Sequence, residues 1–280
     1  MDLRRLKTIF ILILVAINIT LGSLLYSSHS YEKKEQQLMV ESLGSLLAKD
    51  MIYFAPGLEF PDTPKIYRFF LEKSFGNTDG LIKRFLGDAS YNANGDEYEN
   101  ENGILQLSGA EFKFYNKKQA DPINDFSEKN IEQLCRKEMK RLGIFANLYV
   151  FSGMNFSDEG IKAIFTANHD GFSFFDAYIS FDVSRDGITS ISGRNMVSGL
   201  DVSDSTSSFF CIMSILSDLP SNTGLEKNIS HSIVSITPGY YIGKTAENYR
   251  NVLAIPVWQI VTDSGTILYY DARNGKSVIE

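Results

Sequence analysis

Residues 8–26 read TIFILILVAINITLGSLLY, nineteen residues without a formal charge. At 1.5 Å per residue, a helix of this length crosses most of a hydrocarbon core of roughly 30 Å. Arg4, Arg5 and Lys7 precede the stretch, and by the positive-inside rule they keep the short N-terminus in the cytoplasm. The sequence therefore predicts a single-pass protein of the cell membrane, whose chain from about Ser27 onward is extracytoplasmic.

A cleaved secretory signal is the alternative interpretation, because it shares the basic start and the apolar middle. The apolar core of a signal usually spans about 7–15 residues and ends in a small-x-small site. Here apolar residues continue to Leu24 and Leu25, and no clean site of that kind follows. The pattern favours a retained anchor.

Five small or polar residues lie within the predicted span. Asn18 is costly to bury in lipid unless its amide finds a partner. At 100° per residue, Ala16, Thr20 and Ser23 share one narrow face, while Asn18 and Gly22 share a nearly opposite one. Such faces let another helix approach closely, so these five residues are the predicted partner contacts in the membrane. The alternative is that a single-pass anchor simply tolerates them.

Composition limits the function of the outer part, which is long enough for one large domain or two lobes. The chain is 44% hydrophobic, 12% aromatic and 22% charged, as in ordinary folded proteins. Without Asp2, Arg4, Arg5 and Lys7, it keeps 24 basic and 33 acidic residues, a formal charge of −9. This charge disfavours nucleic acid and anionic lipid as partners.

Helices and strands are predicted to alternate in the first part of the outer chain. Glu32 to Lys49 has apolar residues at helical spacing and predicts an amphipathic helix. Three prolines follow, then a short helical stretch from Ile66 to Leu71 and a helix from Asp79 to Leu86. Ala89 to Tyr115 predicts strands, with Asn94-Gly95 as a hairpin turn.

The second part predicts two longer helices, each followed by strands. Asp125 with Glu128 resembles a capped helix start, and Gly143 is placed to end that helix. A further helix is predicted from Ser203 to Leu219. The expected strands, with turns at Asp186-Gly187 and Asp263-Ser264-Gly265, are 146–151, 160–167, 172–183, 188–192, 229–236, 252–261 and 265–270.

A helix followed by an antiparallel meander thus recurs at least twice. The predicted fold is α+β, with each helix covering one face of a curved sheet. The predicted divisions are an anchor (1–30), an N-terminal α+β lobe (31–118) and a C-terminal lobe of two helix-plus-sheet units (119–280). Cys135 falls on an apolar helix face, whereas Cys211 lies away from one, which favours two free thiols over a disulfide.

Motifs for catalysis, cofactors and metals are missing from the sequence. His29, His169 and His231 are widely separated and form no ligand-spaced cluster. The turn composition around His169-Asp170 is a sufficient explanation of that pair. The acidic run of Asp96, Glu97, Glu99 and Glu101 lacks the spacing of a calcium loop and is interpreted as a solvated hairpin edge. No enzyme, cofactor or metal site is therefore predicted.

Both ends of the chain resemble the YycI/YycH family. The C-terminal stretches are Ile236-Thr237-Pro238-Gly239-Tyr240-Tyr241, Ile255-Pro256-Val257-Trp258-Gln259-Ile260 and Tyr269-Tyr270-Asp271-Ala272-Arg273-Asn274-Gly275. The opening Met1-Asp2, then Lys7-Thr8-Ile9-Phe10 and an apolar helix containing Asn18, is similar to the start of YycI proteins. Trp258 itself is expected to pack within the sheet.

The resemblance implies a non-catalytic regulator of the sensor histidine kinase YycG, also called WalK, in control of cell-wall metabolism. In that family the membrane helix contacts the kinase, and the outer domain pairs with a sister protein, YycH. The closing strands are also similar to PepSY-type modules, which leaves a tethered binding or inhibitory module as the alternative. A small-ligand sensor using Phe172, Phe174, Phe175 and Tyr178 is a further alternative, although such aromatics are more often sheet core.

Overall fold

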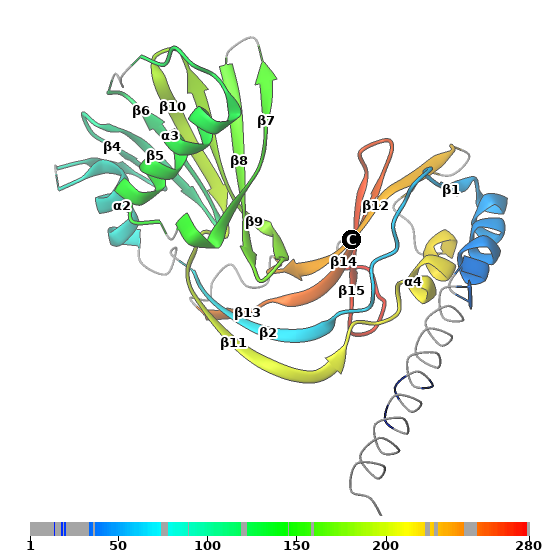
Figure 1. Ribbon diagram of the computed structural model, residues 1–280. Coiled ribbons are helices and arrows are strands. Elements are labelled where there is room, and N and C mark those ends of the chain that lie inside the picture. The colour runs from blue at the N-terminus through cyan, green and yellow to red at the C-terminus, as the bar shows by residue number, and fades with distance from the viewer. Residues whose placement is uncertain are drawn as a thin grey trace, which may run out of the picture.

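The chain is a mixed α+β protein that consists mostly of antiparallel sheet (Figure 1). The structure, a computed structural model, describes Leu14, Asn18, Thr20 and residues 34–35, 37–73, 78–88, 90–118, 122–144, 146–157, 160–221, 225–226, 229–243 and 251–278. It contains a helix at 37–47, which we call the N-terminal helix, followed by the short turn η1 (Ala48–Asp50). The other helices are α2 (Thr78–Leu86), α3 (Glu128–Arg141) and α4 (Ile212–Asp218), with short turns η3 (Ala146–Leu148) and η4 (Leu219–Ser221).

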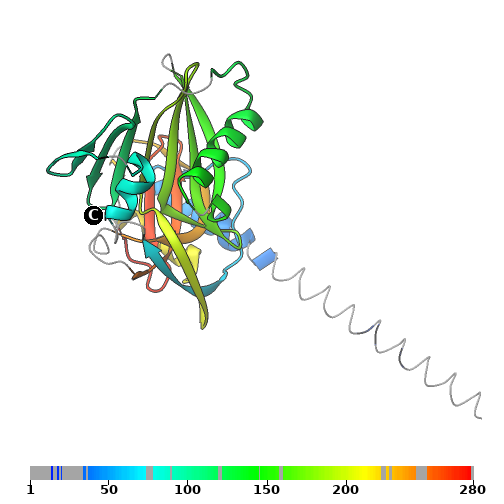
Figure 2. The same cartoon turned by 90° about the vertical axis from the view of Figure 1, so that its left-hand side faces the viewer.

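The first lobe is one antiparallel sheet with two helices on one face (Figure 1), and in Figure 2 both helices lie in front of the sheet. Its strands lie in the order β7-β8-β9-β10-β6-β5-β4-β3. α2 packs on β5, and α3 packs on β7 and β8. Side chains alternate between the two faces of β9, and Ile179 and Phe181 are buried in the same core as Cys135 and Met139 of α3. The bounds are β3 (Asn92–Asn94), β4 (Glu97–Glu99), β5 (Gly103–Ser108), β6 (Glu111–Asn116), β7 (Tyr149–Ser157), β8 (Gly160–His169), β9 (Phe172–Ser184) and β10 (Gly187–Arg194).

The second lobe combines the beginning and the end of the described outer chain. β12 (His231–Tyr241), β14 (Ile255–Thr262) and β15 (Ile267–Asp271) form an antiparallel ladder, and β1 (Ile52–Phe54) pairs with β12 in parallel. A separate three-stranded sheet has the order β11-β2-β13, formed by β11 (Val197–Ser208), β2 (Lys65–Lys73) and β13 (Asn251–Leu253). It curves along the lower side of the molecule in Figure 1.

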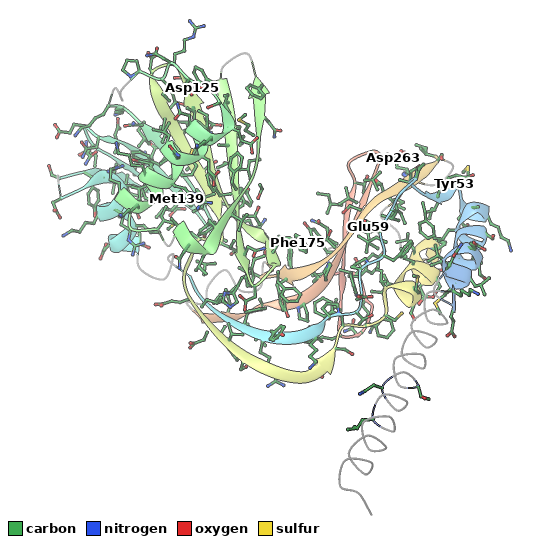
Figure 3. All side chains as sticks on the ribbon, in the orientation of Figure 1. Tyr53, Glu59, Asp125, Met139, Phe175 and Asp263 are labelled. Carbon is green, nitrogen blue, oxygen red and sulfur yellow. The ribbon has the colours of Figure 1, made fainter. Side chains whose placement is uncertain are left out.

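Strand β9 joins the two lobes, because it pairs with strands of both. Most of one edge of β9 pairs with β10, but at its start Ser173 and Phe174 pair with Gly239 and Tyr240 of β12. A Cβ atom at Gly239 would stand 2.6 Å from the Ser173 carbonyl oxygen and 2.5 Å from the Phe175 ring. Glycine is therefore required for this close approach of two backbones. Figure 3 places Phe175 where the lobes meet.

An aromatic cluster fills the space beneath this junction. We define it as Phe69, Phe172, Phe174, Phe209, Tyr240 and Trp258. The Phe69 and Tyr240 rings are perpendicular with centroids 4.5 Å apart, and Phe209 stands 5.5 Å from Trp258. Trp258 has no exposed surface, and its indole N–H donates to the Phe210 carbonyl at 2.8 Å. The expectation that Trp258 packs within the fold is confirmed.

The predicted helix from Ile66 to Leu71 is wrong, because these residues form the centre of β2. Phe69 and Leu71 are buried and Phe70 is exposed, the alternation of a strand with one covered face. Both ladder partners of β2 lie more than a hundred residues away in the sequence. Local spacing could not reveal that pairing, and tertiary context overrode it.

The predicted helix from Ser203 to Leu219 is also wrong in its first half. Residues up to Ser208 belong to β11, and α4 begins only at Ile212. The segment up to Ser208 is rich in Ser, Thr and Asp, whose side chains compete with helical backbone hydrogen bonds. The apolar face expected for the second half is confirmed, since Ile212, Met213 and Leu216 are buried.

Most other predicted elements are confirmed. α2 and α3 match their predicted positions, and Gly143 has a positive φ of 66° just after α3. The α3 start differs in detail: Ser127 occupies the N-cap position, and Asp125 instead accepts hydrogen bonds from Ser127. Most of the predicted strands and the three predicted hairpins are present within the described residues, with shifted ends. The single strand predicted over 252–261 is wrong, because this stretch is divided between β13 of the three-stranded sheet and β14 of the larger sheet. Residues 146–148, predicted to begin a strand, form the turn η3.

Cys135 is buried and Cys211 is exposed, and both are free thiols. Burial, with smaller effects of Glu138 and Glu132, raises the pKa of the Cys135 thiol to about 12. The expectation of a core thiol at this position is confirmed. The boundary at 118/119 stays a prediction, although the pairing of β2 with β11 and β13 crosses it.

The predicted membrane span lies almost entirely outside the described residues. Of its residues, Leu14, Asn18 and Thr20 are described, and all three are helical and exposed. Within the described ranges, none of the helices combines the length and the apolar character that a bilayer span requires.

Candidate functional site

A groove between the N-terminal helix and α4 is the candidate functional site. The N-terminal helix forms because apolar residues recur at helical spacing. Its stripe is divided between two environments: Leu43 and Leu47 are buried, whereas Met39 and Leu46 are 47% and 43% exposed. The amphipathic helix predicted over 32–49 is thus confirmed where the chain is described, and one edge of its apolar stripe remains uncovered.

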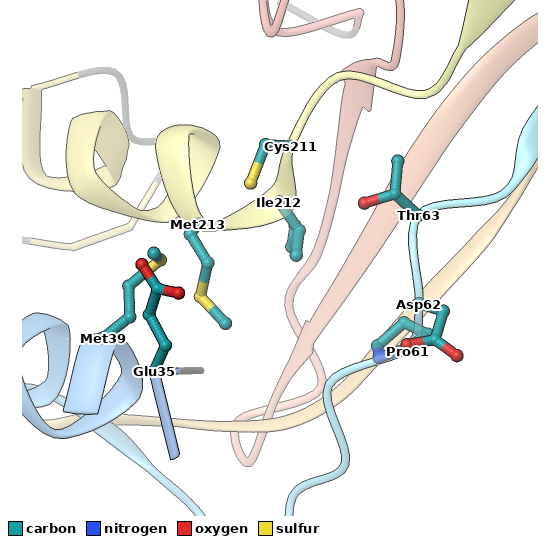
Figure 4. Close-up of a pocket in the computed structure, with 8 residues that line it drawn as sticks. All are labelled: Glu35, Met39, Pro61, Asp62, Thr63, Cys211, Ile212 and Met213. Carbon is teal, nitrogen blue, oxygen red and sulfur yellow. The ribbon is translucent and has the colours of Figure 1, made fainter. Parts of the chain in front are cut away.

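The groove continues along both helices. One part, of about 660 Å³, is lined by Met39, Leu43 and Leu46 of the N-terminal helix and by Ser214 and Ser217 of α4. A second part, of about 320 Å³, extends towards residues 61–63 (Figure 4). Met39, Cys211 and Met213 line both parts.

The floor of the groove is apolar and its rim is polar. Figure 4 shows Met39 and Glu35 on one side, Met213 and Cys211 on another, and Asp62 with Thr63 across from them. Glu35 and Asp62 are exposed at one end, and Lys49 lines the other end. Flexible methionine side chains suit a surface that packs against a partner. An apolar floor with a polar rim is the usual composition of a protein-binding surface.

The predicted membrane contacts are only partly described. Ala16, Gly22 and Ser23 lie outside the described residues. Asn18 and Thr20 are helical and exposed, and neither residue lines the groove. The groove itself was missed by sequence reasoning. One feature of the sequence could have indicated the groove: the apolar stripe at 39–47 is wider than the single face of a helix that packs on its own domain.

The aromatic residues proposed for a ligand pocket do not face one space. Phe172 and Phe174 belong to the aromatic cluster, while Phe175 packs against Tyr269 with ring centroids 5.5 Å apart. The sheet-core interpretation of these residues is confirmed for Phe172 and Phe174.

The His169-Asp170 pair and the acidic run at 96–101 lie at a turn and in a hairpin, as the sequence predicted. His169 ends β8, and the turn that follows contains Asp170 with a φ of 49°. The acidic run forms the β3–β4 hairpin, where Glu97 accepts from Gln106 at 2.8 Å and Glu99 pairs with Lys117. Among the described residues, no group of three or more His, Cys, Asp and Glu side chains is arranged to hold a metal ion.

A buried carboxylate at the lobe junction was not foreseen. Asp176 of β9 accepts hydrogen bonds from the backbone N–H groups of Ile242 and Gly243, at 2.8 and 2.9 Å, and from Asn195 Nδ2 at 3.0 Å. Burial raises the pKa of this carboxyl, and the hydrogen bonds and Arg194 oppose the shift. Asn195 is fully buried with a φ of 46°, and its Oδ1 atom has no hydrogen-bond partner among the described residues. This polar cluster ties β9 of the first lobe to the end of β12.

Fold and site together define a mixed α+β protein, mostly sheet, with an apolar groove at one end. No protein-family model matches the chain, and no curated protein matches its sequence.

Among solved structures, three likenesses can be reported. An uncharacterized protein from Eubacterium rectale aligns over 88% of this chain and 99% of its own, at 12% identity and a TM-score of 0.46. YycH from Bacillus subtilis aligns over 75% of this chain at 14% identity and a TM-score of 0.47, and this chain spans 50% of that protein. The YpeB C-terminal domain of Bacillus megaterium aligns over 74% of this chain and 96% of its own, at 8% identity and a TM-score of 0.37.

Proposed function

We propose that this chain is a non-catalytic, single-pass membrane regulator of a sensor histidine kinase of the YycG (WalK) type, acting with a YycH-like sister protein in control of cell-wall metabolism. The resemblance at both ends of the sequence supports the proposal. The single structural observation that carries it is the apolar groove beside the N-terminal helix. That helix follows the predicted span closely in the sequence, so a protein that fills the groove is expected to approach from the membrane side.

The proposed mechanism divides the contacts between membrane and outer domain. Within the membrane, Ala16, Asn18, Thr20, Gly22 and Ser23 would touch helices of the kinase. A regulator can shift a kinase between signalling states only by as much as its contacts differ between those states. The groove would hold an extracytoplasmic segment of the partner and so orient the anchor.

Replacement of residues 8–26 by an unrelated apolar helix tests the membrane contact. We expect the tagged native protein to recover a histidine kinase and a second single-pass protein from membranes, and the substituted protein to lose the kinase. Mass spectrometry of the two eluates measures this directly. Recovery of the same extracytoplasmic partner by both proteins, without a kinase, would support the alternative of a tethered PepSY-like binding or inhibitory module.

Leu46→Asp tests the groove. Leu46 lines the groove and is 43% exposed, so a carboxylate there should disturb partner binding and leave folding intact. We expect recovery of the sister protein or kinase to fall about tenfold, as for loss of one central apolar contact. Leu38→Asp is the matched control, because Leu38 lies on the same helix, is 66% exposed and does not line the groove. Equal recovery with both variants would exclude the groove as the contact.

A further inference from the structure

A second cavity, of about 370 Å³, lies where β13 leaves the edge of β2. β13 pairs with β2 only between Phe70 and Glu72, and the Ala254 N–H then donates to the Phe69 carbonyl at 2.9 Å before the chain turns into β14. Nearer the start of β2, the Tyr240 hydroxyl accepts from the Tyr67 N–H at 2.9 Å and donates to the Tyr67 carbonyl at 3.1 Å. The backbone N–H and carbonyl groups of Tyr67 at this edge of β2 are therefore hydrogen-bonded without a further strand, and space remains beside the edge.

Two arginines line this cavity. Arg68 is exposed, and among the described residues it forms no ion pair. Arg273 is bound to Asp271 through Nε at 2.9 Å and Nη2 at 2.6 Å, so the charge of Arg273 is compensated while Nη1 can still donate. The cavity thus offers one uncompensated positive charge and a second guanidinium donor.

The other walls are largely apolar. Ile66 is buried, Pro256 is buried and Leu253 is 47% exposed, and all three line the cavity. Ser208 adds a hydroxyl at one side. The volume is near the lower end of the range for small-ligand sites. A ligand that fits this arrangement has one anionic group for the guanidinium groups and a small apolar substituent for the remaining walls.

We propose that this cavity binds the carboxylate of a small apolar monocarboxylate, such as the C-terminal carboxylate of a peptide that ends in an aliphatic residue. Arg68 and Nη1 of Arg273 donate to the carboxylate oxygens, a geometry to which planar guanidinium groups are well suited. A dianionic phosphate matches the site less well, because only one positive charge is uncompensated. The assignment is independent of the regulator proposal, since it uses no residue of the groove.

Binding of a matched pair of peptides to the full-length protein in detergent micelles tests the proposal. The probes are acetyl-Ala-Leu with a free carboxylate, its C-terminal amide, and inorganic phosphate, each titrated calorimetrically. We expect the acid to bind and the amide to bind at least about tenfold more weakly, since a charge-assisted hydrogen-bond pair is lost. Arg68→Gln should abolish the preference for the acid. Arg185→Gln, a change at an exposed arginine in the β9–β10 turn, should preserve the preference.

A second variant distinguishes a loss of carboxylate binding from misfolding of the Arg68→Gln protein. Leu253→Glu places a negative charge at the exposed edge of the cavity, so it should weaken binding of the acid and spare the amide. Equal binding of acid and amide to the native protein would overturn the proposal. So would an unchanged acid preference in Arg68→Gln, or tighter binding of phosphate than of the peptide acid.

Discussion

Trp258→Ala is expected to lower the free energy of unfolding by about 4 kcal/mol, the usual cost of removing a large buried aromatic side chain. Trp258 is fully buried and contacts Phe209 in the aromatic cluster, which joins β2, β9, β12 and β14. Its loss leaves a cavity at the point where both lobes pack. The indole N–H also donates to the Phe210 carbonyl, so the variant leaves that carbonyl without its partner.

Urea unfolding followed by far-ultraviolet circular dichroism measures this effect. Fluorescence is unsuitable, because Trp258 is the only tryptophan in the chain. Trp258→Phe keeps most of the volume and removes the N–H, so it should cost about 1–2 kcal/mol. Phe156→Ala is the control at an aromatic that is 70% exposed, and it should stay within about 0.5 kcal/mol of the native protein. A cost below about 1 kcal/mol for Trp258→Ala would contradict the packing described here.

Asp176→Ala is expected to cost about 3 kcal/mol at pH 5, because it leaves three buried donors without their acceptor. These donors are the backbone N–H groups of Ile242 and Gly243 and the Nδ2 amide of Asn195. Since the carboxyl ties β9 to the end of β12, the loss should also loosen the two lobes relative to each other. Hydrogen exchange at residues 239–243 should rise more than exchange in α3.

The cost of this substitution should depend on pH. Burial raises the pKa of the Asp176 carboxyl above its usual 3.8, so the folded protein holds this proton more tightly than the unfolded chain does. The resulting contribution to stability is complete below the usual pKa and is lost as the pH rises through the raised one. The difference between the native protein and Asp176→Ala should therefore be larger at pH 4 than at pH 8. Asp201→Ala, at an exposed position on β11, should show no such trend, and an equal trend in both variants would contradict the assignment.

Local patterns predicted those elements whose stability comes from their own sequence. The hairpin predicted at Asn94-Gly95 forms one residue later, because Gly95 and Asp96 lie between Asn94 and its ladder partner Glu97. Gly95, Gly187 and Gly265 adopt positive φ at these hairpins, which glycine does without steric cost. α3 could be predicted because its apolar residues recur at one spacing along a single buried face. Burial of Cys135 follows from its place on that face.

Only one of the two helices that form the candidate site could be predicted correctly from the sequence. An amphipathic helix over 32–49 could be predicted, but which part of its stripe would stay exposed depended on α4, and α4 was placed too early and made too long. Arg68 and Arg273 lie more than two hundred residues apart, so no spacing in the sequence indicates that they line one cavity.

The sequence by itself thus determined the α+β class, the positions of the three hairpins and the helices with one apolar face. Tertiary structure decided that Ile66 to Leu71 is a strand, that β9 serves both lobes and that a carboxylate is buried at Asp176. The physical reason is the range of the interactions. Turn chemistry and periodic burial act within a few residues, whereas ladder partners and the acceptors of buried donors come from distant segments that meet only when the chain has folded.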